Sequence, residues 1–330
     1  MTPSFDLKHT RLMGLPPFDL PQFKKKDKRP SIDELLHCEK PMTVCIAMMA
    51  VETETRYPAI VFITDRQFTV SNVLKFETGV SKFCHIQDYT GQYNAGVLIS
   101  AGDITLSYEI VREVIDNIET RCHSGENVKV TDIANSLYNE CKKRNGENEF
   151  KLKFNAQFIV FGIDRLPQGI SRHISIITKN LEDPYLSNKS CDTEGYAIIG
   201  SGYWAAFFEL VRCKCVTTPC KCSYHPYMDL PEVIFRVYRA KKEGERAEGV
   251  GEGTDLGILQ LADGATKIGF KSLNTSKIYE VLDNEINDIK KFEGILIKKG
   301  APDIDAILEN TPIHQFKITK KSLAETRGSF

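Results

Sequence analysis

The sequence lacks the features that would place the protein in a membrane or on a nucleic acid. No apolar run in its 330 residues reaches the roughly 18 residues that a membrane-spanning helix needs, and the first 30 residues hold no apolar stretch typical of secretory signals. The formal net charge is only -1, with a pI of about 6.7, so there is no overall attraction to nucleic acid or anionic lipid. We therefore expect a cytoplasmic protein that binds neither.

The composition favours one large domain with flanking segments. Hydrophobic residues make up 42% of the chain and charged residues 26%, which is ordinary for a globular protein. Residues 1–41 are rich in proline, which suppresses helices and strand pairing, so we expect a flexible N-terminal arm or propeptide there. The domain is expected over 42–300, with no internal repeat, and a C-terminal extension over 301–330. The prolines of the arm are Pro3, Pro16, Pro17, Pro21, Pro30 and Pro41.

Apolar runs of strand length alternate with helical patterns after the arm. The runs at 43–51 and 59–65 flank a polar turn and predict a buried hairpin. Further strands are predicted at 95–100, 156–163, 173–178, 196–200, 256–262 and 267–273. Pairs of helices separate these groups of strands. This order favours an α+β fold of two antiparallel sheets with helices outside them over single-helix crossovers between parallel strands.

Four amphipathic helices are predicted from apolar residues that recur every three or four positions. The second is expected to begin at a cap formed by Thr131 or Asp132. The expected buried faces are, in chain order, Ile104, Tyr108, Val111, Ile115 and Ile118; Ile133, Ala134, Leu137, Tyr138 and Cys141; Trp204, Phe207, Phe208 and Val211; and Val233, Ile234, Val237 and Tyr238.

Five short motifs, in order, resemble the landmarks of proteasome-type N-terminal-nucleophile (Ntn) hydrolases. They are "TVCIA" at the start of a strand, "ITDRQFT" after the hairpin, "VSKFCHI", "SAGD" before a helix, and "IIGSGYWAA" before another. Their order and spacing are similar to those of the 20S proteasome β-type subunits and of the simpler bacterial peptidase that works with an unfoldase ring. The resemblance covers about residues 42–262. It implies a four-layer αββα sandwich, two antiparallel sheets flanked by helix pairs.

The chemistry of the first three motifs fits a threonine nucleophile. A threonine hydroxyl is a weak nucleophile at neutral pH and needs a base beside it. The α-amine of Thr43 would serve if Thr43 began the mature chain, because such amines have a pKa of about 7.7 to 8.0, whereas a peptide nitrogen would not. The resemblance assigns Lys82 and Asp65 to the supporting positions, where an ammonium favours the alkoxide and a carboxylate keeps the lysine charged.

Two later motifs supply the other members of the implied site. The resemblance assigns the oxyanion-binding amide to the backbone between Ile99 and Ala101, that is, to Ser100 or Ala101. It places Ser201 near the amino group of the nucleophile. Each residue also has an ordinary interpretation: Thr43 as a strand residue, Asp65 as half of a turn pair with Arg66, Lys82 as a surface lysine, and Ser201 as a helix N-cap.

The loop "AEGVGEGTD" departs from the family pattern. Glu248 falls where the family has an aspartate, and Gly251 falls where it has a serine, so one supporting hydroxyl is missing. Glutamate is a reasonable substitute for aspartate, but glycine offers only its backbone. Thr254 and Asp255 follow closely and are alternative members of this part of the site.

The segment before Thr43 departs as well. Self-cleaving proteasome precursors carry glycine before the nucleophile, and this chain carries Met42 after Pro41. Two explanations stay open. Either Met42 is the true start and its removal exposes Thr43, or residues 1–41 stay attached and the site is silent.

The cysteines divide into two groups. Most of the 10 lie in apolar patterns and are expected to be free thiols in a reducing compartment. The remaining group, Cys213, Cys215, Cys220 and Cys222, lies in "CKCVTTPCKC", a Cys-rich insertion over 213–225. Four thiolates suit a structural zinc ion, although the CxC spacing is unusual; the alternative is an exposed, reduced insertion. No cofactor is expected for catalysis.

Three functional hypotheses follow. The first is a threonine peptidase or amide hydrolase acting on peptides or proteins through Thr43, Asp65, Lys82, Ser201 and Glu248, assembled into a homo-oligomeric ring and served by an ATP-dependent unfoldase, as the resemblance implies. The second is a catalytically silent assembly or sensor subunit with the same fold. The third is a small-molecule amidase of the Ntn class.

Overall fold

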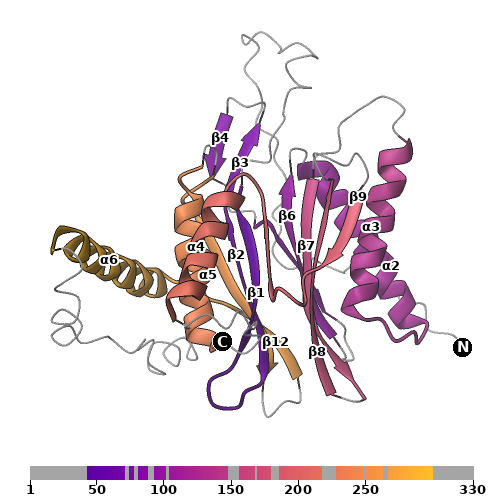
Figure 1. The fold of residues 1–330 in the computed structure, drawn as a ribbon. Helices are drawn as coiled ribbons and strands as arrows, with labels where there is room; N and C mark the ends of the chain where they lie inside the picture. The colour runs from indigo at the N-terminus through magenta and orange to yellow at the C-terminus, as the bar shows by residue number, and fades with distance from the viewer. Residues whose placement is uncertain are drawn as a thin grey trace, which may run out of the picture.

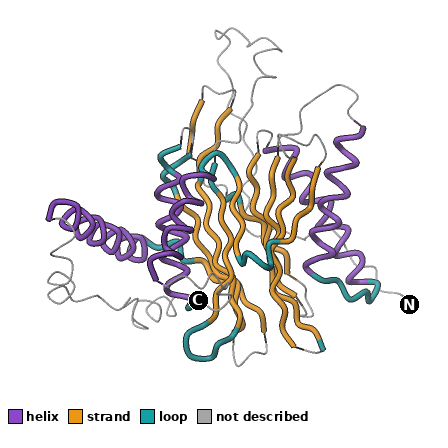
Figure 2. The backbone as a smooth tube through the Cα atoms, in the orientation of Figure 1, coloured by secondary structure: helices purple, strands orange, loops and turns teal. Residues whose placement is uncertain are grey.

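The protein is a four-layer sandwich of two β-sheets enclosed by helices (Figures 1 and 2). The computed structural model describes residues 43–70, 74–77, 81–87, 93–101, 104–147, 156–167, 169–179, 186–217, 228–247, 250–262 and 267–299. In this part of the chain, two five-stranded sheets pack face to face, with α4 and α5 on one outer side and α2 and α3 on the other. The predicted αββα arrangement is confirmed.

The first sheet holds the strand that begins the proposed site. Its order is β10-β1-β2-β11-β12, with every pair antiparallel. The strands are β1 (Cys45–Val51), β2 (Pro58–Asp65), β10 (Tyr196–Ile199), β11 (Thr254–Ala262) and β12 (Lys267–Ser272). β1 and β2 form the predicted hairpin, in which Cys45 lies opposite Thr64.

The second sheet follows the order β5-β6-β7-β8-β9 and is also antiparallel. Its strands are β5 (Phe83–Gln87), β6 (Tyr93–Ala101), β7 (Ala156–Leu166), β8 (Gly169–Lys179) and β9 (Leu186–Ser190). A separate two-stranded sheet, β3 (Gln67–Val70) with β4 (Leu74–Glu77), continues from the end of β2. The patterns in the sequence did not predict β3, β4, β5 or β9, which are only four or five residues long.

The helices are α2 (Ile104–His123), α3 (Val130–Glu147), α4 (Tyr203–Thr217), α5 (Leu230–Gly244) and α6 (Ser276–Lys299). Three apolar cores separate the layers: one between the first sheet and α4, α5 and α6, one between the second sheet and α2 and α3, and one between the two sheets. In the last, the ring of Phe62 stacks on Phe83 with centroids 4.2 Å apart and meets Phe161 at 5.1 Å. Burying these aromatic rings on both sheets holds the sandwich together.

The predicted buried face of α4 is wrong at Trp204 and Phe208, whereas Phe207 packs against the core and the side chain of Val211 lies outside the described residues. Trp204 is 64% exposed and Phe208 63%, whereas Ala206 and Leu210 are buried and Phe207 is half-buried. The small side chain of Ala206 lies on the buried side of α4, and the largest aromatic rings lie on its outer side. Aromatic residues at helical spacing therefore misled the prediction, because periodicity alone does not say which side faces the core.

Two other helix predictions need correction. α3 begins at Val130, so Thr131 and Asp132 lie inside its first turn rather than at the cap; the Asp132 carboxylate accepts a hydrogen bond from the Lys129 amide at 2.9 Å. α6 was not predicted at all. One side of α6 reaches the core through Leu282 and Ile286, with Ile278, Tyr279 and Ile289 packed against the same core, while the far end of the helix projects away from the sandwich (Figure 1).

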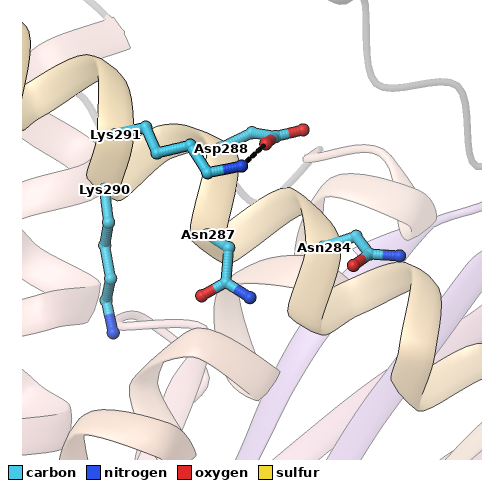
Figure 3. A pocket seen from close by; sticks show the side chains of 5 residues that line it. All are labelled: Asn284, Asn287, Asp288, Lys290 and Lys291. Carbon is cyan, nitrogen blue, oxygen red and sulfur yellow. Dashed lines mark hydrogen bonds and ion pairs between the residues drawn. The ribbon is translucent and has the colours of Figure 1, made fainter.

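A pocket on α6 is lined by five residues of that helix, Asn284, Asn287, Asp288, Lys290 and Lys291 (Figure 3). Its lining is polar and includes the solvent-exposed ion pair of Lys291 with Asp288, 3.0 Å apart. Such exposed pairs add little stability. Among the described helices, none is long and apolar enough to cross a lipid bilayer.

Candidate active site

The candidate site lies where β1 begins and β2 ends. Thr43 directly precedes β1 and is 2% exposed. Asp65 is the last residue of β2 and is fully buried. Because the hairpin places the two strand ends side by side, the Asp65 amide donates to the Val44 carbonyl at 3.3 Å and the Asp65 side chain reaches Thr43. Asp65 is therefore a buried strand residue and not simply half of a turn pair with Arg66.

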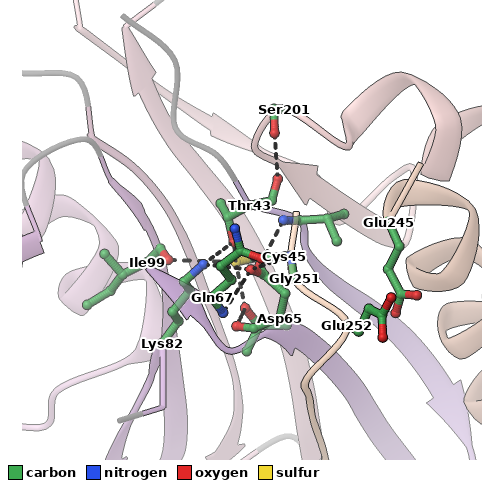
Figure 4. Close-up of polar contacts among 12 residues, drawn as sticks. Thr43, Cys45, Asp65, Gln67, Lys82, Ile99, Ser201, Glu245, Gly251 and Glu252 are labelled. Carbon is green, nitrogen blue, oxygen red and sulfur yellow. Dashed lines mark hydrogen bonds and ion pairs between the residues drawn. The ribbon is translucent and has the colours of Figure 1, made fainter. Parts of the chain in front are cut away.

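The Asp65 carboxylate is the acceptor at the centre of the site (Figure 4). Oδ1 accepts from the Thr43 hydroxyl and from the Val44 amide at 3.0 Å. Oδ2 accepts from the amides of Gln67 at 3.2 Å and Gly251 at 3.3 Å, and from Lys82 Nζ at 3.0 Å. Donors from four separate segments therefore meet at one carboxylate, which fixes its orientation.

Lys82 joins the second sheet to this cluster. It lies just before β5, its carbonyl accepts from the Ile99 amide of β6 at 3.0 Å, and it is 3% exposed. Nζ lies 2.6 Å from Thr43 Oγ1 and 3.0 Å from Asp65 Oδ2. Lys82 is thus a buried lysine and not a surface one. Burying an ammonium is costly unless it is paired, and here Asp65 provides the counter-charge.

The carbonyl of Thr43 is enclosed by the turn that leads into α4. The Gly202 amide donates to the Thr43 carbonyl oxygen at 3.1 Å, and Ser201 Oγ donates to it at 3.4 Å. Gly200 adopts φ +99°, and a Cβ at that position would collide with the Thr43 carbonyl group. Only glycine fits there. Ser201 therefore contacts the carbonyl of Thr43, whereas the sequence led us to expect it at the amino group.

The oxyanion candidates lie at the end of β6. Ser100 is fully buried, and its hydroxyl has no hydrogen-bond partner among the residues that the structure describes. Ala101 follows as the last residue of the strand. Next to them, Cys45 Sγ donates to the Ile99 carbonyl at 3.7 Å and lies 3.9 Å from Thr43 Oγ1. Burial raises the pKa of the Cys45 thiol to about 11, so this thiol stays protonated at neutral pH.

The loop before β11 shows what occupies the place of the expected serine. A Cβ on Gly251 would overlap the Cβ of Gln67 and lie 3.1 Å from the Gln67 amide nitrogen. The space for a side chain is thus already filled by β3. Thr254 Oγ1 donates to the Glu252 carbonyl at 3.1 Å, and Asp255 pairs with the Arg66 guanidinium at 2.6 Å, so these contacts lead away from Thr43. Glu248 lies outside the described residues.

The sequence did not single out Lys241, which the structure places next to this loop. Lys241 has no exposed side-chain surface, and Nζ donates to the carbonyl oxygens of Gly251 at 3.1 Å and Glu252 at 2.8 Å. The stretch "RAKKEGER" has the composition of a solvated helix end. The burial of Lys241 could have been predicted from helical spacing, because it lies four residues after Val237 and three after Tyr238, on the buried face of the helix.

The cysteine cluster stays a hypothesis. Cys213 and Cys215 belong to α4 by their backbone, whereas Cys220 and Cys222 lie outside the described residues. No group of three metal-binding side chains occurs within the described ranges, which omit most of this cluster. The five cysteines whose side chains are described are free: Cys45, Cys84, Cys122, Cys141 and Cys191.

Comparison with known proteins identifies the fold. No family model matches the chain, and no curated relative does. Among solved structures, Anbu (ancestral beta-subunit) from Yersinia bercovieri matches with a TM-score of 0.52 and 12% identity, over 76% of this chain and 96% of that one. The Anbu complex from Pseudomonas aeruginosa, described as a helical assembly, matches with a TM-score of 0.50 and 14% identity, over 79% and 98%. At such low identity the likeness shows the fold alone, and that fold is the four-layer αββα sandwich predicted from the sequence.

Proposed function

We propose that this protein is a proteasome-like threonine peptidase or amide hydrolase whose nucleophile is the Thr43 hydroxyl. The observation that carries the proposal is the 2.6 Å contact between Lys82 Nζ and Thr43 Oγ1, made inside a buried cluster completed by Asp65. A structural threonine at a strand start needs no ammonium beside its hydroxyl. A nucleophilic threonine does, because the positive charge stabilises the alkoxide that forms during attack.

The reaction requires that Thr43 carry a free α-amine. Thr43 Oγ1 bonds to the carbonyl carbon of the substrate amide, and its proton passes to that amine. The substrate C–N bond breaks, the amine returns the proton to the leaving nitrogen, and an ester on Thr43 remains. Water hydrolyses the ester to the carboxylic acid and restores the hydroxyl. Lys82 stabilises the charge on Oγ1, and Asp65 holds Lys82.

The remaining site residues receive supporting roles in this proposal. The backbone of Ser100 or Ala101 would donate to the oxyanion, since both follow Ile99, whose carbonyl contacts the Cys45 thiol that lies 3.9 Å from Thr43 Oγ1. Ser201 would hold the Thr43 carbonyl through its 3.4 Å contact. Glu248 would be the acidic member of the loop before β11. The substrate class is a peptide or protein.

The decisive experiment combines intact mass and covalent labelling. Protein purified from its native source should have a mass corresponding to a chain that begins at Thr43, and a β-lactone should form an ester at that residue. The variant Thr43→Ala should not be labelled, whereas Thr178→Ala, which removes a threonine of β8, should be labelled like the parent. A native chain that keeps Met42 attached, and that no β-lactone labels, would sink the proposal.

A catalytically silent subunit is the second candidate, favoured by two observations. The space beside Gly251 is filled by Gln67, so the supporting hydroxyl of the family has no room to return. In the 330-residue chain the nitrogen of Thr43 is also a peptide nitrogen, since Met42 precedes it. In this case the Thr43 cluster would stabilise the fold only, and Thr43→Val would lower the melting temperature without removing an activity.

We also propose that the chain assembles with copies of itself. The support is that the similar Pseudomonas aeruginosa protein is described as a helical assembly. A ring, and service by an ATP-dependent unfoldase, are the finer forms of this proposal. Light scattering on the purified protein should give a multiple of the single-chain mass found by intact-mass measurement of the same sample, and a single-chain mass at all accessible concentrations would contradict it.

A further inference from the structure

A second buried lysine lies behind the loop that contacts Asp65. Lys241, in the last turn of α5, is completely buried. Its Nζ donates to three acceptors: the Gly251 carbonyl at 3.1 Å, the Glu252 carbonyl at 2.8 Å and the Glu245 carboxylate. These contacts join the end of α5 to the loop that precedes β11.

The contacts require the charged form of Lys241. An ammonium has three N–H donors and no acceptor, which matches three acceptors, whereas a neutral amine would face one of them with a lone pair. Burial lowers the pKa of Lys241 and the nearby Lys242 acts in the same direction, while Glu245 and Asp65 raise it. The carboxylate of Glu245 is thus what keeps this ammonium protonated in a buried place.

The loop is held from both sides at Gly251. Its carbonyl is bound by Lys241, and its amide donates to Asp65 Oδ2 at 3.3 Å. A side chain at this position is excluded by Gln67, so the backbone itself approaches the site. The position of one amide donor to Asp65 therefore depends on Lys241.

We propose that Lys241 is a positioning residue of the Thr43 site, which fixes the Gly251 amide against Asp65 by binding the carbonyls of Gly251 and Glu252. Its effect on Thr43 rests on the function proposed above; its effect on the loop rests on the contacts alone. Lys241 acts through Asp65, which in turn bonds to the Thr43 hydroxyl and Lys82.

The first test measures hydrogen exchange in the full chain. In Lys241→Met, which keeps the length of the side chain but not its donors, amides of peptides spanning Gly251 should lose protection by about tenfold or more, since hydrogen bonds to a charged group are lost. The matched control is Lys242→Met. Lys242 is the next residue and pairs with the same Glu245 carboxylate at 3.3 Å, but its bond runs to that carboxylate and not to the loop. Its removal should change the protection less than twofold.

The second test uses pH, which a purely space-filling role would not affect. Protection of the same peptides, corrected for intrinsic exchange at each pH, should fall as pH rises through the pKa of Lys241. In Glu245→Gln the counter-charge is gone, so this loss should occur at lower pH than in the parent. Glu245→Gln also decides the question if Lys241→Met does not fold.

The third test links the loop to the nucleophile. The rate at which a β-lactone labels Thr43 should fall about tenfold in Lys241→Met and stay within twofold in Lys242→Met. Unchanged protection in Lys241→Met, or an unchanged pH profile in Glu245→Gln, overturns the proposal. So does normal labelling of a chain whose loop has lost protection. If even the parent is not labelled, the proposed function fails, and the exchange measurements alone decide whether Lys241 positions the loop.

Discussion

Restoring the serine that the family pattern expects at position 251 should damage the protein instead of improving the site. The Cβ of Gly251→Ser would overlap Gln67 Cβ and lie 3.1 Å from the Gln67 amide nitrogen. Both atoms belong to the first residue of β3, whose amide also donates to Asp65 at 3.2 Å. Neither is the end of a flexible side chain, so the backbone must move, and the donor to Asp65 moves with it.

The expected cost follows from overpacking. Forcing extra atoms into a filled space typically costs about 1–3 kcal/mol. For a domain of about 150–250 residues, each kcal/mol lowers the melting temperature by about 2–4 °C, so Gly251→Ser should melt about 2–12 °C below the parent. The added hydroxyl should not increase the rate at which Thr43 is labelled.

A double-mutant cycle separates this collision from other effects. Gln67→Gly removes the colliding Cβ but keeps the amide, so combining it with Gly251→Ser should recover most of the lost stability, beyond the sum of the single changes. Gln67→Ala keeps the Cβ and should recover little. Denaturant unfolding of the four proteins of each cycle measures this. Unchanged stability of Gly251→Ser, or equal recovery with Gln67→Ala and Gln67→Gly, refutes the reasoning.

Three other predictions concern the rest of the molecule. Burial raises the pKa of the Cys141 thiol from 9.0 to about 12. Above pH 9 the unfolded chain therefore loses this proton before the folded chain does, and the free energy of unfolding should fall by up to about 1.4 kcal/mol per pH unit. Unfolding by urea at pH 8 and pH 10 should show a smaller fall in Cys141→Val than in the parent. His173 makes hydrogen bonds to Asp192 and to Ser175, each at 2.7 Å, an arrangement similar to that of a serine hydrolase, but Ser175 is buried. We expect these three residues to have a structural role, so a fluorophosphonate should not label Ser175. Labelling of Ser175 would contradict this prediction. If the cysteine cluster binds zinc, metal analysis should find about one ion per chain, and Cys220→Ser should lower it; a metal-free parent purified without chelator would end that hypothesis.

The sequence predicted the features that depend on local pattern. The hairpin of β1 and β2 follows from two apolar runs around a polar turn, and its pairing alone brings Thr43 and Asp65 together. Lys82 required the resemblance, because nothing in "VSKFCHI" distinguishes a buried lysine from an exposed one. The structure supplies the missing fact, since the amide of Ile99 holds the Lys82 backbone against β6 and so aims the side chain between the sheets.

The sequence could not predict the features that depend on which parts of the folded chain pack against each other. On α4, aromatic residues and small residues share the same periodicity, and the core lies against Ala206 and Leu210 instead of Trp204 and Phe208. At Gly251 the space for a side chain is filled by Gln67, which lies 184 positions earlier in the sequence (251 − 67). A one-dimensional pattern contains neither relation.

The hydrogen bonds around the Asp65 carboxylate are already formed in the uncleaved chain, which bears on how the site would become active. Within the described part of the chain, the donors to the Asp65 carboxylate are the Thr43 hydroxyl, three backbone amides and Lys82, and none of them is the α-amine of Thr43. The geometry around Oγ1 therefore forms while Thr43 is still joined to Met42. Freeing the amine would add the base without rebuilding its surroundings, so activation would require cleavage of one peptide bond and no rearrangement of the sheets.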